Sequence, residues 1–351
     1  MVNLNLNDLF NEIKHDNESA KNINSKVLLV DGLNSYIRAF CRNPAMNDDG
    51  THIGGIVGFF NTVASSIRTL NVTRCIIVFD GKGGSIRRRE IFPEYKSQRK
   101  GLRVRLNRTY DFQTHDEKES EADRQLRRVA DYLDYLPLQM MMWDNIEADD
   151  VMSYLAKDLL KEEVIIMSTD KDFLQLVDDR IKVWSPTKKK LYDTEGVKED
   201  YFVPPQNLIY FRILDGDKSD NIPGLKGIGL KTAQKHLPIL FDEEKVSLDS
   251  LIEYADRQPG KNTAARKISE NKEQLRLNYK LMKLGEIEIS GTTKAKIREL
   301  LDAPVSILNR FKLKQLFLAD KLYSAIPNID SWLNINFNKL NAFAMTSQNK
   351  E

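Results

Sequence analysis

Short runs of apolar residues, each bounded by polar residues, recur along the first 200 positions of the chain. They are rich in Val, Ile and Met and occupy residues 26–30, 74–79, 138–143, 163–167 and 181–184. Their length and composition predict buried β-strands. Between them, apolar residues recur at helical spacing, as in Ile56, Phe59, Phe60, Val63 and Ile67. Strands that alternate with helices predict an α/β fold: a twisted, mainly parallel central sheet with helices on both faces.

The strand pattern fades after about residue 204. Apolar residues in 208–214, 275–284 and 307–322 recur at helical spacing, which predicts a second, mostly helical domain. We therefore expect an α/β domain at 26–203 and a helical domain at 204–340, with polar tails at 1–25 and 341–351.

The composition narrows the class of protein. Hydrophobic residues make up 41% of the 351 positions and charged residues 30%, a globular mixture that excludes wholesale disorder. Two cysteines and four scattered histidines cannot form a disulfide framework or a zinc site, so any bound metal needs oxygen ligands. The chain has no apolar run near the ~20 residues of a membrane span, and its first 26 residues lack the apolar core of a signal peptide. We expect a cytoplasmic protein without membrane contact.

Charge is distributed unevenly, although the net charge is only +2. Residues 82–108 hold ten basic and two acidic side chains, and residues 111–124 hold six acidic and two basic ones. A solvated pair of charged helices would explain this pattern, and so would a surface that gathers a phosphate backbone.

Acidic residues follow the predicted strands. They are Asp31, Asp80, Glu147, Asp149, Asp150, Asp170 and Asp172. A single Asp after a strand is commonly the N-cap of the next helix, but capping does not require acids two residues apart. Because ligands of open parallel sheets bind beyond the carboxyl ends of the strands, these acids predict one shared site. Their mutual repulsion would be relieved by divalent cations such as Mg²⁺ or Mn²⁺, and two such ions suit phosphodiester hydrolysis.

Two further motifs lie in the predicted helical domain. The segment DGDKSDN places Asp217 and Asp220 three residues apart, either as a turn-rich loop or as further metal ligands. The segment IPGLKGIGLKTAQK places Gly224, Gly227 and Gly229 before a helix, where backbone N–H groups can meet a phosphate. A loop shaped only by helix packing is the alternative. The spacing does not match a nucleotide-binding P-loop, because Leu230 separates the last glycine from the following Lys-Thr pair.

Read in order, the motifs VDG, FDG, YKSQR, EADD, STDKDF and GDKSDNIPGLKGIGLKTA resemble the 5′-nuclease superfamily over about residues 26–240. This superfamily includes flap endonucleases, the 5′-nuclease domain of bacterial DNA polymerase I and phage ribonuclease H-type exonucleases. The segment VWSPTKKKLY and the chain length look most like the T-even phage ribonuclease H branch, which implies a bacteriophage replication protein.

The resemblance implies a helical arch over the active site at about residues 82–125 and a helix-three-turn-helix (helix-hairpin-helix) element that grips duplex DNA. It implies a first metal site formed by Asp31, Asp80, Glu147 and Asp149, and a second formed by Asp150, Asp170, Asp172, Asp217 and Asp220, in part through water. Lys96 resembles the lysine that reaches the scissile phosphate, with Arg99 one helical turn further on and Tyr95 able to stack on a terminal base.

DNA contacts are expected in two places. The basic block offers Arg87, Arg88, Lys100 and Arg103, and the hairpin offers Lys226, Gly227, Gly229, Lys231, Thr232 and Lys235. In the superfamily the hairpin often holds a monovalent cation such as K⁺.

The function implied is a 5′→3′ exonuclease, flap endonuclease and ribonuclease H that depends on two Mg²⁺ or Mn²⁺ ions. Its substrates would be branched or nicked DNA and RNA–DNA hybrids, in lagging-strand DNA replication. Two alternatives remain open. A non-catalytic branched-DNA-binding replication protein would not need all nine acids, and a PIN-type ribonuclease would lack the hairpin at 222–235.

The N-terminal segment LNLNDLF places Leu6, Leu9 and Phe10 on one apolar face of a single helical turn. This face would pack on its own domain or insert into a pocket of a replication sliding clamp. We also expect a monomer, and contact with a single-stranded-DNA-binding protein through the C-terminal domain.

Overall fold

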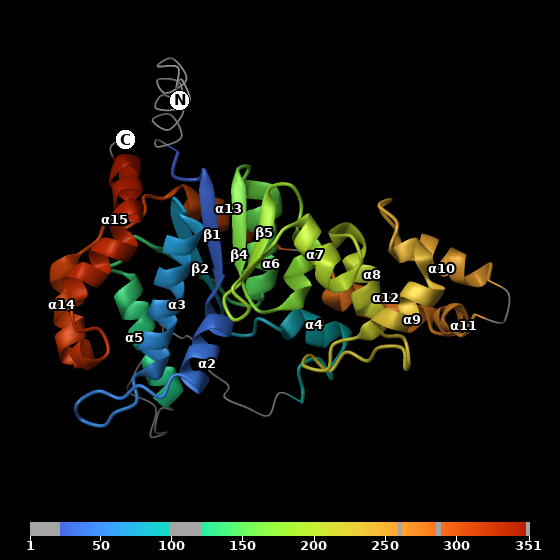
Figure 1. The fold of residues 1–351 in the computed structure, drawn as a ribbon, viewed down its shortest axis with the longest axis horizontal. Coiled ribbons are helices and arrows are strands. Elements are labelled where there is room, and N and C mark those ends of the chain that lie inside the picture. Colours follow the sequence, from blue (N-terminus) through green and yellow to red (C-terminus); the bar gives the residue numbers. More distant parts are fainter. Residues whose placement is uncertain (1–21, 99–120, 259–261, 286–288, 349–351) are drawn as a thin grey trace, which may run out of the picture.

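The computed structural model of the chain describes residues 22–98, 121–258, 262–285 and 289–348. A six-stranded sheet with strand order β3-β2-β1-β4-β5-β6 runs through the centre (Figure 1). The strands are β1 (Lys26–Asp31), β2 (Arg74–Asp80), β3 (Gln139–Trp143), β4 (Glu163–Met167), β5 (Ile181–Ser185) and β6 (Lys190–Tyr192). The first five are parallel and confirm the predicted strands to within one residue. The sequence pattern does not predict β6, an antiparallel strand too short to show a period.

The central strands are buried on both faces. Val27 of β1 lies opposite Arg74 of β2 and Val164 of β4, and the strands continue in register from there. Residues 27–30 are fully buried. Near-continuous apolar runs are what a parallel sheet needs when helices cover both of its faces.

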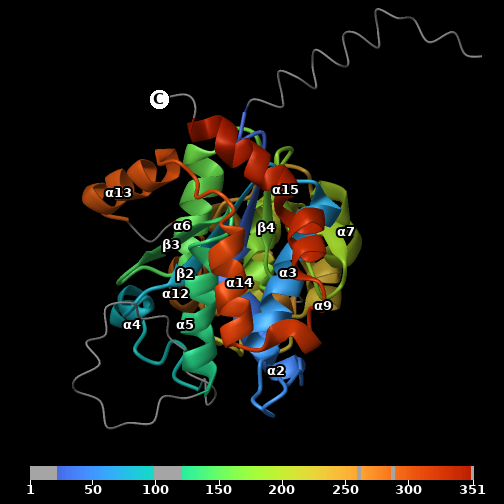
Figure 2. The same cartoon turned by 90° about the vertical axis from the view of Figure 1, so that its left-hand side faces the viewer.

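One face is covered by α2 (Gly32–Arg42), α3 (Gly54–Leu70), α5 (Glu121–Leu133), α14 (Arg310–Ala319) and α15 (Ile329–Gln348). Phe59 of α3 is fully buried beneath this layer, in one cluster with Phe317 of α14 and Phe337 of α15. Figure 2 shows α14 and α15 in front of α3. The C-terminal helices therefore complete the core of the α/β unit.

The opposite face is covered by α6 (Ala148–Tyr154) and a π-helical turn (Leu155–Leu159), and the hydrophobic cluster beneath them continues into the helices that follow the sheet. Those helices are α7 (Thr194–Tyr201), α8 (Pro205–Asp215), α9 (Leu230–His236), α10 (Leu248–Asp256), α11 (Thr263–Glu270), α12 (Lys272–Met282) and α13 (Gly291–Asp302). Short helices also occur at Ile86–Ile91 (α4) and, as 3-10 turns, at Lys171–Leu176, Pro238–Leu240 and Leu322–Ser324.

Two predicted boundaries differ from the structure. The helices after residue 204 do not form one body, because α7 to α12 extend to one side of the sheet whereas α14 and α15 return to α3 (Figure 1). The polar tail predicted at 341–351 is wrong for residues 341–348, which continue α15 and bury Ala344. Sequence periodicity identifies these helices but not the face on which they pack. The part of the chain that the structure describes contains no helix long and apolar enough to cross a membrane.

Candidate active site

The topology brings the predicted acids to one edge of the sheet. Asp31 and Asp80 are the last residues of the neighbouring parallel strands β1 and β2. Asp31 is also the N-cap of α2, because Oδ1 accepts a hydrogen bond from the backbone N–H of Asn34 at 3.1 Å. Asp80 Oδ1 accepts from the N–H of Ala148 at 2.7 Å, which fixes the start of α6 beside β2. Capping uses one oxygen of each carboxylate, so the capping and ligand interpretations are compatible here.

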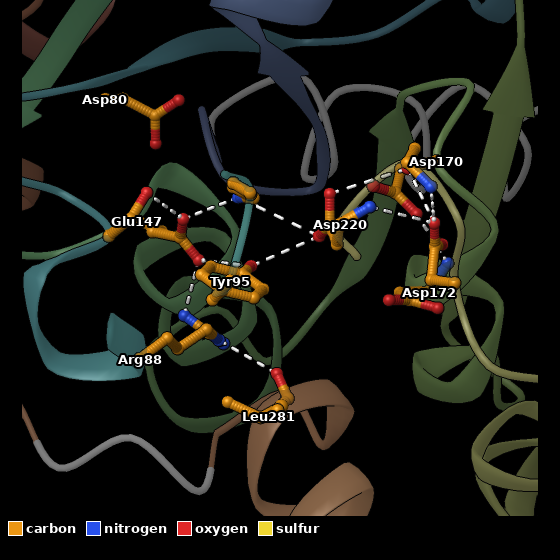
Figure 3. A network of polar contacts seen from close by, with 12 residues as sticks. Asp80, Arg88, Tyr95, Glu147, Asp170, Asp172, Asp220 and Leu281 are labelled. Atoms are coloured by element: carbon orange, nitrogen blue, oxygen red, sulfur yellow. Dashed lines mark hydrogen bonds and ion pairs between the residues drawn. The ribbon is translucent and has the colours of Figure 1, made fainter. Parts of the chain in front are cut away.

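Asp170 and Asp172 follow β4 in the same way. Asp170 is the N-cap of the 3-10 turn that follows the strand, and its Oδ1 accepts from the N–H of Asp172 at 2.8 Å. Ser168 joins this pair to β1, since its hydroxyl donates to Asp31 Oδ2 at 3.0 Å and accepts from the N–H of Asp170. Figure 3 shows Asp80 and Glu147 on one side of the site and Asp170 and Asp172 on the other.

The sheet-edge acids disfavour one another's ionisation. Burial, followed by the charge of Asp80, raises the pKa of Asp31 to about 7. Burial, followed by Asp31 and Asp170, raises the pKa of Asp149 well above its ordinary value. Burial, followed by Asp170, raises the pKa of Asp172 to about 7 despite the neighbouring Arg212. Crowded carboxylates of this kind are stabilised by positive charge brought from outside.

Glu147 has a different environment, because two cations of the chain contact it. Lys96 Nζ donates to its Oε1 at 2.5 Å, and the buried Arg88 donates to its Oε2 at 2.6 Å. The hydroxyls of Ser85 and Tyr95 also donate to it, at 2.8 and 3.1 Å. Burial opposes its ionisation, but Lys96 and then Arg88 lower the pKa of Glu147 to about 2. Glu147 is therefore ionised at any physiological pH.

The structure corrects three predictions around this group. Arg88 is only 3% exposed and donates to Glu147 and to the carbonyl of Leu281 (Figure 3). It also donates to both oxygens of Asp150, so it cannot be a DNA contact. Asp150 is 1% exposed and both of its oxygens accept from Arg88, so it is not a ligand of the second metal site. Tyr95 is 3% exposed inside the core and cannot stack on a base. Sequence spacing does not reveal which side chains turn inward.

Acids of the helical region face the sheet edge across Tyr95. The Tyr95 hydroxyl lies 3.1 Å from Glu147 Oε2 and 3.2 Å from Asp220 Oδ2 (Figure 3). Lys96 Nζ lies 4.0 Å from Asp220, and the Lys96 N–H donates to the Asp220 carbonyl at 2.8 Å. Asn221 donates its side-chain amide to the carbonyl of Glu94. The DGDKSDN loop is thus docked on the YKSQR segment.

Arg212 of α8 is a residue of the site that none of the sequence motifs includes. Its guanidinium bridges Asp172 at 2.9 Å and Asp217 at 2.7 Å, so it joins an acid of the sheet edge to an acid of the helical region. Burial favours the neutral form of Asp217, but Ser219 and Arg212 lower its pKa. The signal available in the sequence is a lone arginine five residues before Asp217, within the otherwise uncharged run LIYFRIL at 208–214.

Backbone geometry shapes the loop after α8. Gly216 has φ +75°, and a side chain there would meet the backbone of Gly224, which lies against Asp215 in turn. Asn278 of α12 holds this crossing, because its buried amide donates to the carbonyls of Ile213 and Pro223. The close crossing explains two of the glycines in the DGDKSDNIPGLKGIG stretch.

The hairpin residues predicted to bind DNA are largely on the surface. Lys226, Gly227, Gly229, Lys231 and Lys235 are exposed, whereas Thr232 is half-buried. Arg87 is half-buried on α4. The predicted roles of Arg99, Lys100 and Arg103 fall on residues outside the described part of the chain.

The acidic set suits hydrated divalent cations. In the described residues no three acidic, histidine or cysteine side chains lie close enough to enclose one ion as they stand. Mg²⁺ needs no such cage, because it keeps several water ligands and binds through one or two carboxylates. The all-oxygen donors and the raised pKa values of Asp31, Asp149 and Asp172 fit such an ion.

Two sequence models of one protein family match the chain. The 5'-3' exonuclease N-terminal resolvase-like domain matches residues 26–202, and the 5'-3' exonuclease C-terminal SAM fold matches residues 203–299. The chain belongs to the 5'-3' exonuclease family. The predicted superfamily resemblance is thereby confirmed. α14 and α15 lie beyond both matches.

Relatives with known names agree with this assignment. A 5'-3' exonuclease of Bacillus subtilis (strain 168) is 30% identical over 304 residues, which are 83% of this chain and 94% of that protein. The thermostable DNA polymerase I of Thermus thermophilus is 34% identical over 262 residues, which are 74% of this chain. The chain spans 28% of the length of that polymerase.

Solved structures show the same fold. The T5 D15 protein, co-crystallised with metal ions, has a TM-score of 0.57 at 21% identity, with 84% of this chain and 98% of that chain covered. The eukaryotic junction-resolving enzyme GEN-1 has a TM-score of 0.52 at 14% identity, with 92% and 73% covered. The narrower resemblance to the T-even phage branch stays a prediction.

Proposed function

We propose that this nuclease is a divalent-cation-dependent 5′→3′ exonuclease and flap endonuclease. Its substrates would be branched or nicked DNA and RNA primers paired with DNA, in lagging-strand replication. The observation that carries the proposal is the approach of acids of the helical region to those of the sheet edge: Asp220 meets Glu147 at Lys96. Asp217 meets Asp172 at Arg212. One solved structure of similar fold is described as a T5 D15 flap endonuclease complex with DNA and metal ions, which supports this choice.

The residues fall into two groups of candidate ligands. Asp31, Asp80, Asp149 and Glu147 would surround one hydrated Mg²⁺ or Mn²⁺ ion, and Asp170, Asp172, Asp217 and Asp220 would surround the other, most of them acting through water. Such ions, when bound, activate water and neutralise charge on a phosphodiester.

Lys96 would act on the phosphate itself. Its side chain is 13% exposed beside Glu147 and Asp220, and the ammonium, on sharing these contacts with a phosphate oxygen, would stabilise charge that develops there. The Tyr95 hydroxyl contacts both Glu147 and Asp220, so Tyr95 would act as a positioning residue for these two acids.

Substrate binding would combine the helical region and the basic block. Exposed Lys226, Lys231 and Lys235 supply charge for duplex phosphates, independent of base sequence. The clamp contact through Leu6, Leu9 and Phe10 lies outside the described residues and stays a prediction, as do the single-stranded-DNA-binding protein contact and the monomeric state.

The decisive experiment is cleavage of a 5′-labelled flap duplex with and without Mg²⁺. We expect Mg²⁺-dependent release of short 5′ products from the parent protein. Binding without cleavage would favour a non-catalytic branched-DNA-binding protein. Cleavage of single-stranded RNA alone would favour a PIN-type ribonuclease.

A further inference from the structure

The side chain of Lys267, on α11, contacts the backbone of the glycine hairpin at residues 222–235. Its Nζ donates to the carbonyl of Lys226 at 2.5 Å. The next residue, Gly227, has φ +82°, and a side chain there would begin only 3.3 Å from the same Nζ. The ammonium therefore lies against the hairpin backbone at its left-handed turn.

The position of Lys267 is fixed by the way α11 packs. Asn262 caps the helix by accepting from the N–H groups of Ala264 and Ala265. The same side chain donates to the carbonyl of His236, at the end of α9. One residue thus ties the start of α11 to the helix that follows the hairpin, side by side in Figure 1.

The charge of Lys267 is not cancelled by the protein. Over the described ranges, no acidic side chain forms an ion pair with it, whereas nearby Lys272 pairs with Asp256 at 2.7 Å. The contact to Lys226 is to a neutral carbonyl, which leaves a full positive charge beside the exposed hairpin. A side chain at Gly229 would meet nothing within 4 Å, so this surface is open to a ligand.

A carbonyl oxygen and a phosphate oxygen repel each other unless a cation lies between them. An ammonium has three N–H donors, of which the Lys226 carbonyl takes one. The other two can be donated to a phosphate oxygen at the open side of the hairpin. A free monovalent cation would perform the same task by coordinating both oxygens.

We propose that Lys267 is the internal cation of the hairpin, which holds the Lys226 carbonyl and takes a duplex phosphate. Where the family resemblance implies a bound K⁺, this chain uses its own ammonium. The inference rests on the proposed function, since it assigns the duplex as ligand.

The test measures binding of the full-length protein to a fluorescent nicked duplex in EDTA, by anisotropy. KCl, NaCl and N-methyl-D-glucamine chloride are compared at equal ionic strength. We expect the parent protein to bind equally in all three salts. Lys267→Met should bind about 10-fold more weakly, and the slope of log affinity against log salt should fall by about 0.9. Lys267→Arg, which keeps the charge, should restore both.

Lys339 provides a matched control. Its Nζ also donates to a backbone carbonyl, that of Asn71, at 3.0 Å, and Asn71 also has a left-handed φ of 54°. Lys339→Met makes the same chemical change in the cluster around α3 and should leave binding unchanged. If Lys267→Met lowers the melting temperature, Lys267→Gln, which keeps a donor but not the charge, should still show the reduced slope.

A parent protein that binds several-fold better in KCl than in N-methyl-D-glucamine chloride would overturn the inference. So would a Lys267→Gln variant with unchanged affinity and salt slope. If the parent protein binds neither nicked nor flap duplex in any salt, the proposed function fails instead.

Discussion

Glu147 and Asp31 lie at the same edge of the same sheet, but their charges are balanced in opposite ways. Glu147 contacts Lys96 and Arg88, which overcome burial and lower its pKa to about 2. Asp31 is buried beside Asp80, which raises its pKa to about 7, and the described residues provide no ion pair to it. The charge of Glu147 is balanced by Lys96 and Arg88 before any metal binds, whereas that of Asp31 needs a cation from solution. Acids that look alike in the sequence thus differ in how much of their charge the fold itself balances.

The largest expected effect is the loss of catalysis when an acid of the same kind as Asp31 is replaced. Asp170→Asn should lower single-turnover flap cleavage in Mg²⁺ by about 10³-fold, because it removes a ligand charge while keeping the N-cap oxygen. Affinity for the flap, measured by anisotropy in EDTA, should remain within a few-fold. Asp200→Asn, on a surface acid paired with Lys190, is the control and should cleave normally. Equal cleavage by Asp170→Asn would refute the metal-ligand assignment.

The second effect is on the free energy of unfolding, which should distinguish Glu147 from Asp31. Arg88→Ala leaves the buried Asp150 without its ion-pair partner and Glu147 with Lys96 alone, and we expect about 3–5 kcal/mol of lost stability in urea unfolding. Asp31→Asn should do the reverse in EDTA at pH 8, since it removes a repelled charge. If both variants were destabilised alike, the contrast between the two acids would be wrong.

The third effect concerns Lys96, which lies between Glu147 and Asp220 and so between the two groups of candidate metal ligands. Lys96→Ala should reduce the single-turnover rate by about 10²-fold and change flap affinity much less, because the ammonium acts where charge develops. The comparison of rate at saturating enzyme with binding in EDTA separates the two effects. Weaker binding at a normal rate would make Lys96 a backbone contact only.

The smallest effect concerns pH. Between about pH 4 and 7 the native Asp31 retains a proton that the unfolded chain has lost, so stability without metal should fall as pH rises through this window. A bound cation replaces the proton, so Mg²⁺ should raise the melting temperature more at pH 8 than at pH 5. Glu147, ionised throughout, contributes nothing to this difference. An equal shift at both pH values would contradict the prediction.

The sequence predicts the frame of this molecule well, because strand length and apolar composition reflect burial directly. The five parallel strands and the acids after them are in place for that reason. Arg88 is misassigned because the spacing of residues does not show that this α4 side chain turns inward toward α12. Asp150, its partner, and the buried Tyr95 are misassigned for the same reason: spacing does not show which side chains turn inward. Arg212 is missed because a single arginine in an apolar helix forms no motif. The return of α14 and α15 to α3 is a matter of topology, which helical periodicity does not encode.

The two outer strands of the sheet bear on how the protein behaves at high concentration. β6 is three residues long and begins with the charged Lys190, and Lys188 lies in the turn before it. At the other edge, Gln139 of β3 donates to the carbonyl of Leu300, and Arg74 of β2 donates to that of Leu301. Short, lysine-rich or covered edges discourage strand-to-strand pairing between molecules. The C-terminal turn of α13 therefore also protects the sheet against aggregation.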